Sequence, residues 1–318
     1  MNFEIDDQQR DFASSIDAAL GAADVPSAIR AWADGDSAPA RKVWAQLTDL
    51  GVTALSVAEK FDGIEAQPID LVVALERLGY WAVPGPVTES VAVAPILLAD
   101  DERSAALAAG ELIATVALTP QVPYAVNADF AGLTLLAGDG RVAEATPGVA
   151  HDSVDPTRRL FEVDVSGDGQ SADTARAYEF GALATAAQLV GAGQAMLDLS
   201  VAYAKQRTQF GRVIGSYQAI KHKLADVHIA VEMARPLVHG AALALADGSP
   251  DTARDVSAAK VAAADAALLA ARSSLQTHGA IGFTQEHDLS LLLLRVQALR
   301  SAWGDPTLHR RRLLEVLS

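Results

Sequence analysis

The sequence predicts a mainly α-helical protein with a small β insertion. Half of the 318 residues are hydrophobic and only 5% are aromatic, a mixture that favours long helices over a strand-rich sandwich. Apolar residues recur at helical spacing towards both ends of the chain, whereas short β-favouring runs occur between about residues 111 and 166. A chain of this length can bury a sizeable core and is long enough for two or three domains.

Residues 1–110 are expected to form an N-terminal helical domain. The acidic side chains of Asp6 and Asp7 precede the first periodic apolar residues, where they would face the positive end of a helix. Gly51 is a candidate helix end, and Pro84-Gly85-Pro86 stops any helix before it. The expected helices run from Asp7 through Ile16, from Ala38 to Gly51, from Ile69 to Leu78 and from Thr88 to Leu98.

Residues 111–172 are expected to form a small middle β-domain. The hydrophobic period changes in this segment, because short β-favouring runs are separated by Gly, Asp and Pro, which mark turns. The expected strands are Leu112–Leu118, Leu133–Leu136 and Leu160–Val165.

Residues 173–318 are expected to form a C-terminal four-helix bundle. The helical segments here far exceed the average helix length, and long helices joined by short loops suit an antiparallel bundle. Pro236 lies inside one of them and should kink it. The expected helices are Ala182–Arg207, Tyr217–Asp247, Thr252–Gln276 and about His287 to Ser301.

The composition argues against several classes of partner and compartment. A formal net charge of -15, without a Lys/Arg stripe interleaved with aromatics, argues against nucleic acid. The chain has no cysteine, its N-terminus is acidic where a signal peptide is basic, and its apolar runs fall short of the ~20 residues that span a bilayer. His278, His287 and His309 lack metal-ligand spacing. We therefore expect a cytoplasmic protein without metal or membrane insertion.

Two segments of the C-terminal half carry a specific resemblance. The first is YAKQRTQFGRVIGSYQ, from Tyr203 to Gln218, and the second is QTHGAIGFT, from Gln276 to Thr284, one long helix later. Both closely resemble signature segments of the acyl-CoA dehydrogenase family, and residues 3–11, 50–63 and 78–86 resemble its N-terminal helical domain. The resemblance covers nearly the whole chain. It implies an acyl-CoA dehydrogenase-like fold, here with a shortened middle β-domain.

Arg207 and Phe210 are the candidate cofactor contacts in the first segment. The chain is expected to turn at Gly211, which would leave the two side chains three residues apart on one helical face. A guanidinium can make forked hydrogen bonds to a diphosphate while an aromatic ring covers a flat apolar surface. A surface Arg beside a core Phe is the simpler interpretation of this pair alone, but the second segment favours the cofactor. The resemblance implies that both residues reach the FAD of an adjacent subunit.

The second segment adds polar and backbone contacts. Gln276 offers an amide, and Gly279 has no Cβ, so a phosphate or adenine could approach the main chain. Ala280 replaces the second glycine of the family's segment, which weakens the argument for close approach at that residue. The resemblance thus implies the following cofactor-binding residues: Arg207, Gln209, Phe210, Gln218, Gln276, Gly279 and Ala280.

Gln218 belongs to a polar row with two interpretations. Gln218, His222 and Asp226 are four residues apart and should line one face of a helix. The row either contacts the cofactor or forms a polar seam between helices, with Asp226 as the partner of a buried His222.

The resemblance also implies a catalytic glutamate, which this chain lacks. The family removes the α-proton of a thioester with a glutamate whose dry surroundings raise its pKa. Gly304 stands where most members carry that glutamate, and Gly181 stands where others carry it. Glu179 and Asp305 lie nearby, but a shift of one or two helical residues rotates a side chain by about 100 to 200°. We expect no catalytic residue here, with Glu179 and Asp305 as weak alternatives.

The middle segment resembles a reduced flavin site. Residues 116–120 resemble the family's flavin-contacting strand, but the usual acidic residue, the Gly-rich continuation and the Trp-Ile-Thr motif are absent. The combination resembles the smaller, base-less subunit of heterotetrameric (α₂β₂) steroid-CoA dehydrogenases of steroid-degrading bacteria. It implies FAD, a larger paralogue bearing the catalytic Glu, α,β-desaturation of a bulky steroid-derived acyl-CoA, and an electron-transfer flavoprotein as acceptor. The alternatives are an active homo-oligomer whose displaced base is Glu179 or Asp305, and a flavin-free scaffold.

Overall fold

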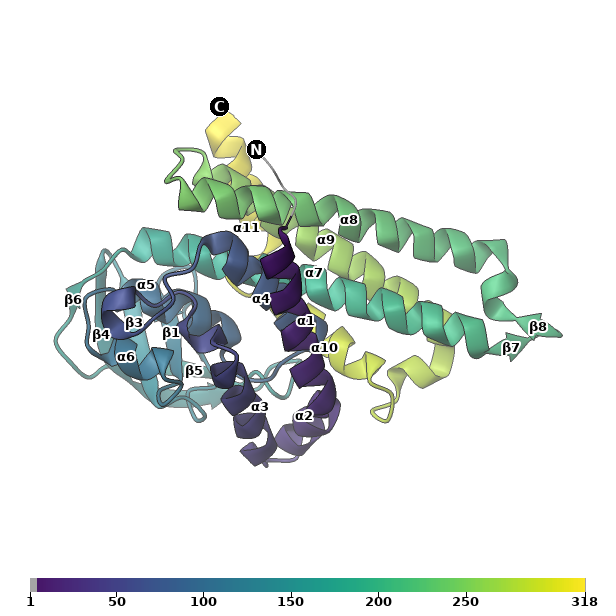
Figure 1. The fold of residues 1–318 in the computed structure, drawn as a ribbon, viewed down its shortest axis with the longest axis horizontal. Coiled ribbons are helices and arrows are strands. Elements are labelled where there is room, and N and C mark those ends of the chain that lie inside the picture. The colour runs from purple at the N-terminus through teal and green to yellow at the C-terminus, as the bar shows by residue number, and fades with distance from the viewer. Residues whose placement is uncertain (1–4, 318) are drawn as a thin grey trace.

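The N-terminal layer is helical, as expected (Figure 1). The computed structural model describes residues 5–317. Phe3 and its neighbours lie outside the described residues. Part of the N-terminal resemblance and the signal-peptide argument depend on them. Asp6 and Gln9 form a capping box at the first helix. The sequence pattern did not predict α2, whose first turn contains Pro26, a position where no helical N–H bond is lost. The elements are α1 (Asp7–Ala22), α2 (Val25–Ala33), α3 (Ala38–Asp49), η1 (Val52–Ala54), η2 (Glu59–Phe61), α4 (Pro68–Tyr80) and α6 (Arg103–Ala108).

The segment after Pro86 is helical but irregular. A π-helix, η3 (Thr88–Val93), leads into the short helix α5 (Ala94–Leu97). Pro95 has no N–H to donate to the Val91 carbonyl, and the N–H of Ala94 instead bonds the Glu89 carbonyl five residues back. Every side chain of η3 is buried, including that of Glu89.

All strands of the main sheet fall within the predicted middle segment. β1 pairs with β3 in parallel and the other pairs are antiparallel, in the order β1-β3-β4-β5-β2, with β6 on β4. The long strand β4 was not predicted because Pro147 and Gly148 indicate a turn. The structure accommodates them in a bulge between Pro147 and Ala150. The strands are β1 (Ala114–Leu118), β2 (Ala125–Val126), β3 (Leu133–Gly138), β4 (Arg141–His151), β5 (Leu160–Val165) and β6 (Gln170–Ser171).

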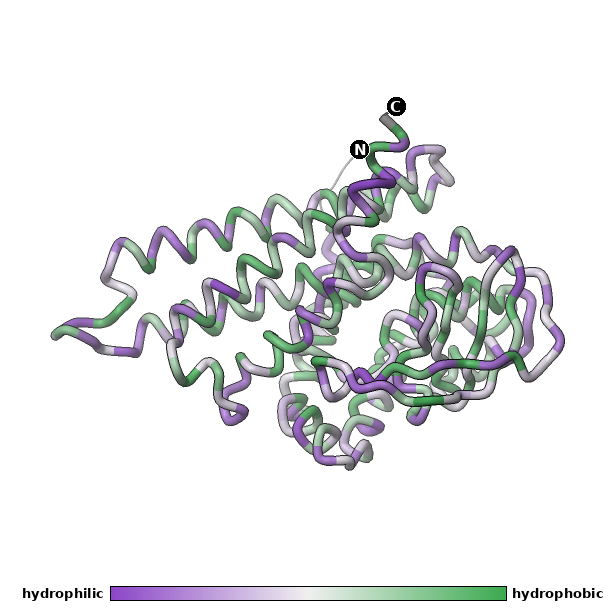
Figure 2. The backbone as a smooth tube through the Cα atoms, turned by 180° about the vertical axis from the view of Figure 1, so that it is seen from behind, coloured by the Kyte–Doolittle hydropathy of each residue, from purple (hydrophilic) through white to green (hydrophobic). Residues whose placement is uncertain are grey.

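Long helices form the C-terminal bundle. Asp173 accepts the Arg176 N–H at 2.9 Å and caps α7, which begins at Thr174, eight residues before the predicted start at Ala182. A Cβ on Gly191 would lie 1.8 Å from the Glu76 carbonyl oxygen, so α4 and α7 pack backbone to backbone. In Figure 2, hydrophobic and hydrophilic residues alternate along the long helices, as expected for helices with one buried face. The elements are α7 (Thr174–Gln206), η4 (Ile214–Ser216), α8 (Gln218–Ala246), α9 (Thr252–His278), η5 (Gly279–Phe283), α10 (Leu289–Ser301) and α11 (Pro306–Leu317).

Among the described residues, α7 and α8 are long and apolar enough to cross a membrane, judged by length and composition alone. A count of consecutive apolar residues, on which the expectation from the sequence rests, does not predict this. The most apolar window of α7 is 94% buried within the molecule and that of α8 is 44% buried. α8 packs against α7 and α9 and exposes Ile229, Met233 and Leu237 on its outer face. Burial inside the bundle accounts for the composition of α7.

A buried ion pair joins α10 to the loop between β4 and β5. Arg295 Nε donates to Asp155 Oδ2 at 2.6 Å, its Nη1 donates to the Val83 carbonyl at 2.7 Å, and its Nη2 donates to Thr157 Oγ1 at 3.0 Å. Burial by itself would raise the pKa of Asp155, but the adjacent Arg295 guanidinium outweighs it and holds that pKa below its ordinary value. The network ties the helical layer, the sheet and the bundle together.

Replacing Arg295 with Met should lower the free energy of unfolding by about 3–5 kcal/mol at pH 7, because the Asp155 carboxylate stays buried without its partner. In the wild type, the pair contributes stability above about pH 4 that is lost as the pH falls through the lowered pKa. In the variant, burial without the guanidinium should raise the Asp155 pKa, so the loss should shrink as the pH falls and the orphaned carboxylate is protonated. Urea unfolding of the wild type and the variant at pH 3, 5 and 7 measures both effects.

The control is Arg310→Met, which removes an ion pair with Asp265 in which both side chains are half exposed. Its loss should stay below about 1 kcal/mol. Equal losses of unfolding free energy in the two variants would show that the buried Arg295 network stabilises the fold no more than the exposed ion pair does.

Candidate functional site

The predicted FAD-contacting residues of the first segment lie on a β-hairpin that projects from the end of the bundle (Figure 1). α7 ends at Gln206, and β7 (Thr208–Gln209) pairs with β8 (Arg212–Val213). Phe210 and Gly211 form the turn with φ of +53° and +78°, as a type I′ turn requires. The prediction that Arg207 and Phe210 share one helical face is therefore wrong, because the helix ends before both residues.

The hairpin presents an aromatic ring and a guanidinium to the outside. Phe210 is 93% exposed in a backbone conformation that aromatic residues rarely adopt. The exposed Arg207 side chain makes no hydrogen bond or ion pair with any described residue. Tyr217 braces the turn: its Oη donates to the Gln209 carbonyl at 3.2 Å, and the Arg212 guanidinium lies 4.0 Å from its ring centroid. Strained backbone of this kind gathers at functional sites.

Gln276 and Gly279 lie at the end of α9, at the same end of the bundle as the hairpin (Figure 1). Gly279 has φ +65° and ψ -141°, a conformation that strongly favours glycine. A Cβ added there would meet nothing within 4 Å, so its backbone is open to a ligand. Gln276 and Ala280 are exposed beside it. The rings of Tyr203 and His278 stack at 4.4 Å and join the ends of α7 and α9.

The polar row on α8 faces outwards. Gln218, His222 and Asp226 are all exposed. The alternative of a seam buried within this chain is wrong, because no hydrogen bond joins His222 to Asp226 in the part of the chain that the structure describes. Whether Gln218 contacts a cofactor stays a prediction.

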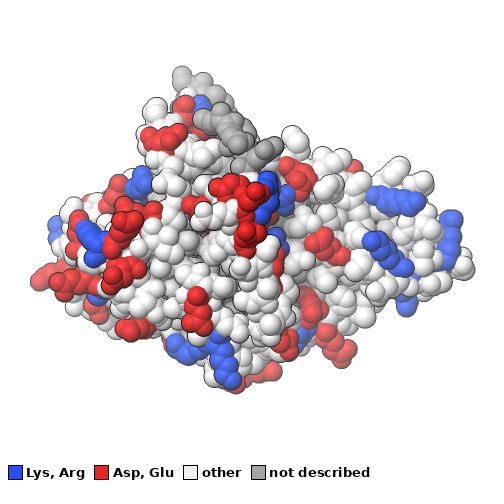
Figure 3. Space-filling view, viewed as in Figure 1, with Lys and Arg blue, Asp and Glu red and all other residues white. Residues whose placement is uncertain are grey.

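Basic residues gather at this end of the bundle although the chain is acidic overall. No acidic residue lies between Asp198 and Asp226. Figure 3 shows Lys and Arg at the hairpin end of the molecule, whereas Asp and Glu gather over the sheet and the centre. The local positive field favours phosphate in spite of the net charge. The Lys and Arg residues of this segment are Lys205, Arg207, Arg212, Lys221 and Lys223.

Trp303 fills the space in front of Gly181, one of the expected base positions. A Cβ on Gly181 would lie 2.2 Å from Trp303 Cε3, so the indole packs directly on the backbone of α7. Trp303 is 1% exposed, and its Nε1 donates to Glu89 Oε1 at 2.9 Å. A carboxylate side chain at residue 181 has no room.

Gly304, the other expected base position, is closed as well. Its φ of +95° disfavours any side chain. A Cβ there would lie 2.6 Å from His309 Nε2 and 2.7 Å from Tyr178 Oη. Both side chains are buried. The two glycines are therefore demanded by packing in this chain.

The nearby carboxylates are engaged elsewhere. Glu179 pairs with Arg312 of α11, and burial raises the pKa of Glu179 while Arg312 opposes the rise. Asp305 is exposed and its Oδ1 accepts the Leu308 N–H at 2.8 Å at the start of α11, a hydrogen bond that lowers the Asp305 pKa. Each carboxylate thus has a structural role.

Lys260 holds the loop that carries Gly304. Its buried Nζ donates to the carbonyls of Leu299, Arg300 and Gly304 at 3.3, 3.1 and 3.0 Å. These carbonyls include the end of α10, where a cation is favoured. Burial lowers the pKa of Lys260 to about 7, with Asp305 opposing the shift.

Lys260→Met should flatten the pH dependence of stability between pH 7 and 10. The folded pKa of about 7 lies below the ordinary value of 10.5, so the unfolded chain binds more protons in this range and wild-type stability rises with pH. This rise is at most ~1.4 kcal/mol per pH unit, and the variant should lack it. Urea unfolding at pH 7.5 and 9.5 measures the slope, with exposed Lys221→Met as the control. Parallel slopes for wild type and Lys260→Met would refute the assignment.

Two buried charged residues beside Trp303 were not predicted as site residues. Glu89 and Arg158 line a cavity of 340 Å³ together with Trp303. The sequence does contain a signal for Glu89, which is the only charged residue from 78 to 99. A single acid in an apolar run is seldom buried without a partner, so it indicates a special role. Arg158 had none, because it stands in a polar stretch next to Arg159.

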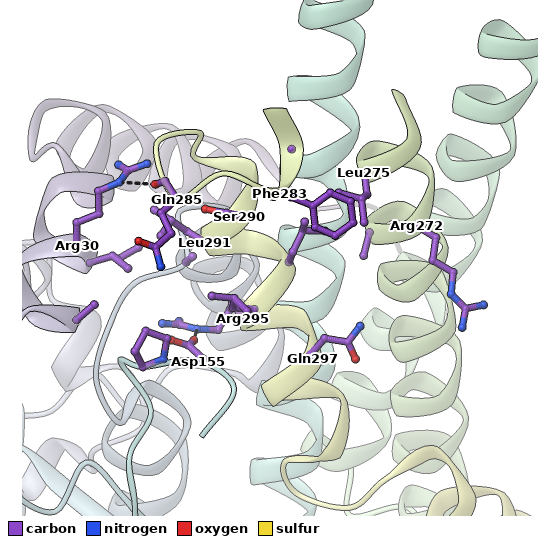
Figure 4. A pocket seen from close by; sticks show the side chains of 18 of the residues that line it. Arg30, Asp155, Arg272, Leu275, Phe283, Gln285, Ser290, Leu291, Arg295 and Gln297 are labelled. Carbon is purple, nitrogen blue, oxygen red and sulfur yellow. Dashed lines mark hydrogen bonds and ion pairs between the residues drawn. The ribbon is translucent and has the colours of Figure 1, made fainter. Parts of the chain in front are cut away.

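A cavity of 710 Å³ lies between α2, α9, η5 and α10 (Figure 4). Figure 4 shows Phe283 beside Leu275 on one side and Arg30 on the other, where Arg30 donates to the Gln285 carbonyl at 3.2 Å. Arg272 points away from it. None of the predicted FAD-contacting residues lines this cavity. The predicted cofactor contacts are instead exposed on the outside of the chain.

Comparison with known proteins finds relatives over most of the chain. The acyl-CoA dehydrogenase IpdE2 of Mycolicibacterium smegmatis is 34% identical over 300 residues, which cover 91% of this chain and 92% of that protein. The structure of the ChsE4-ChsE5 complex from Mycobacterium tuberculosis matches with a TM-score of 0.85 and 22% identity over 100% of this chain and 99% of that one. A variant of the Tcur3481-Tcur3483 steroid ACAD matches with a TM-score of 0.85 and 18% identity over 98% and 97%.

Two family models match the sequence. The acyl-CoA dehydrogenase N-terminal domain matches residues 6–102, and the acyl-CoA dehydrogenase C-terminal domain matches residues 167–318. These matches contain the helical layer up to α5 and the whole bundle, and strands β1 to β5 lie between them. The chain belongs to the acyl-CoA dehydrogenase family.

Proposed function

We propose that this chain is the base-less subunit of a heteromeric, FAD-dependent acyl-CoA dehydrogenase whose larger paralogue supplies the catalytic glutamate. The packing of Trp303 on Gly181 carries the proposal, because it closes one base position while the surroundings of Gly304 close the other. Family membership implies an oxidoreductase with FAD as its cofactor. Proton abstraction from the thioester then falls to the partner.

The hairpin and the end of α9 fit the diphosphate half of FAD. Arg207 offers a guanidinium without a partner, Gly279 offers open backbone, and Gln276 offers an amide. The exposed Phe210 ring can cover a flat apolar surface of the cofactor. The bound cofactor would supply the acceptor for the hydride that leaves the β-carbon of the acyl group. Because these groups face outwards, they would serve a flavin shared with the neighbouring subunit.

The relatives support a finer proposal about partner and substrate. ChsE4-ChsE5 is a complex of two proteins, and the Tcur3481-Tcur3483 enzyme is described as a steroid ACAD. We extend this to an α₂β₂ assembly in the cytoplasm that desaturates a bulky steroid-derived CoA ester and passes electrons to an electron-transfer flavoprotein. The exposed apolar row of Ile229, Met233 and Leu237 on α8 fits a subunit interface.

Co-expression with a longer acyl-CoA dehydrogenase paralogue tests the proposal. We expect a complex with two copies of each chain that contains FAD and oxidises acyl-CoA. Replacing the partner's glutamate should abolish turnover, while Glu179→Gln and Asp305→Asn in this chain leave it unchanged. An isolated homomer that carries full FAD and oxidises acyl-CoA would overturn the proposal and favour the displaced-base alternative.

The scaffold alternative makes a different prediction. A flavin-free subunit would leave the FAD content of the complex unchanged when Arg207 or Gln276 is replaced. The cluster of unpartnered and open groups at the hairpin end favours flavin contact, since a pure scaffold has no need of it.

A further inference from the structure

The 340 Å³ cavity beside Trp303 combines apolar walls with two charged side chains that keep buried atoms without a hydrogen-bond partner. It lies between the end of α10 and the β2–β5 edge of the sheet, and its lining includes Tyr124, Val126, Leu160 and Trp303 as well as Glu89 and Arg158. Cavities of this size with a few convergent polar groups are typical ligand sites.

Arg158 faces this cavity with unmet donors. It is 3% exposed, and its side chain makes no hydrogen bond or ion pair with any described residue. Its Nη1 is completely buried without a partner. Burial lowers the pKa of Arg158, and the negative charge of Glu89 opposes that shift. A buried guanidinium without hydrogen bonds costs stability, so its presence calls for an acceptor.

Glu89 offers the complementary acceptor. It is 0% exposed; its Oε1 accepts from Trp303, while its Oε2 is buried without a partner. No ion pair within 4.0 Å joins Glu89 to Arg158 in the described chain. Glu89 also sits on the π-helix η3, and π-helical turns often mark functional sites. A donor and an acceptor thus line one cavity without meeting.

We propose that this cavity binds a small neutral carboxamide with an aromatic or branched apolar body. The amide carbonyl accepts from Arg158, the amide N–H donates to Glu89 Oε2, and the body packs against Tyr124 and Trp303. A carboxylate fits less well, because it adds a negative charge to those of Glu89 and Asp152, which both line the cavity. A cavity of about 150 Å³ holds benzene, so 340 Å³ accommodates a ligand of roughly ten heavy atoms. The site is independent of the proposed FAD contacts at the hairpin.

The test uses the full-length chain, free and in its complex, with benzamide and benzoate as matched probes. Saturation-transfer NMR and tryptophan fluorescence give the two dissociation constants. Benzamide should bind saturably and at least tenfold tighter than benzoate. Glu89→Gln keeps an amide oxygen for the Trp303 N–H but removes the charge, so benzoate should bind that variant at least tenfold tighter than it binds the wild type.

Arg158→Met should abolish binding of both probes, and Arg159→Met is the matched control. Arg159 pairs with Asp129 on the surface and does not line this cavity, so its replacement should leave both affinities unchanged. Near-UV circular dichroism checks the fold, and the Glu89→Gln result decides the matter if Arg158→Met does not fold. Each of three results would overturn the proposal: no saturable binding, equal affinities for the two probes, or a benzoate affinity of Glu89→Gln no higher than that of the wild type.

Discussion

Arg207→Ala is expected to weaken FAD binding by the heteromeric complex about 10- to 100-fold. The guanidinium has no partner in the described chain, so its hydrogen-bonding capacity is free for a diphosphate. Hydrogen bonds to a charged group contribute about 1.5–3 kcal/mol, and 1.4 kcal/mol is a tenfold change in affinity. A titration of the apo-complex with FAD, monitored by flavin fluorescence, gives the dissociation constant of FAD. The difference in FAD affinity between the wild type and Arg207→Ala should narrow at high salt, because the Arg207 side chain is exposed.

Arg212→Ala is the matched control for this prediction. It removes the same charge from the same hairpin, but the Arg212 guanidinium already lies over the Tyr217 ring. We expect a change of less than about threefold. If both variants bind FAD as the wild type does, the hairpin does not contact the cofactor and the scaffold alternative gains support.

Gly304→Glu is expected to destabilise the chain by more than about 3 kcal/mol and to leave it without base activity. The substitution combines a positive φ with a Cβ placed 2.6 Å from His309 and 2.7 Å from Tyr178. Overpacking of a closed site costs about 1–3 kcal/mol, and a side chain in this backbone region adds about 1–3 kcal/mol. Thermal and urea unfolding measure the loss, and turnover by a complex whose partner lacks its glutamate measures the activity.

Gly140→Ala separates the cost of a side chain at positive φ from the cost of overpacking. Gly140 has φ +73°, but a Cβ there would meet nothing within 4 Å. Its replacement should cost only the conformational part, about 1 kcal/mol, so Gly304→Ala should cost clearly more. A stable Gly304→Glu variant with acyl-CoA oxidation would show that the site is open and would contradict the packing argument.

The sequence alone determined the family and most of the helices. The two C-terminal segments predicted the acyl-CoA dehydrogenase fold, which the family matches confirm. Long periodic segments such as α8 and α9 were placed within two residues, because hydrophobic periodicity and glycine or proline boundaries are local signals. The absence of a carboxylate at Gly181 and Gly304 was also readable directly.

Only the tertiary structure decided why those glycines are there and what lies around them. The contact of Trp303 with Gly181 joins residues more than a hundred positions apart, and no local pattern encodes it. The same holds for Glu89 and Arg158, which meet one cavity because the sheet, η3 and the end of α10 converge. Local patterns also failed at Arg207 and Phe210, where a type I′ turn replaced the expected helical face. Periodicity reports which face of an element is buried, whereas a site depends on which distant elements bury it.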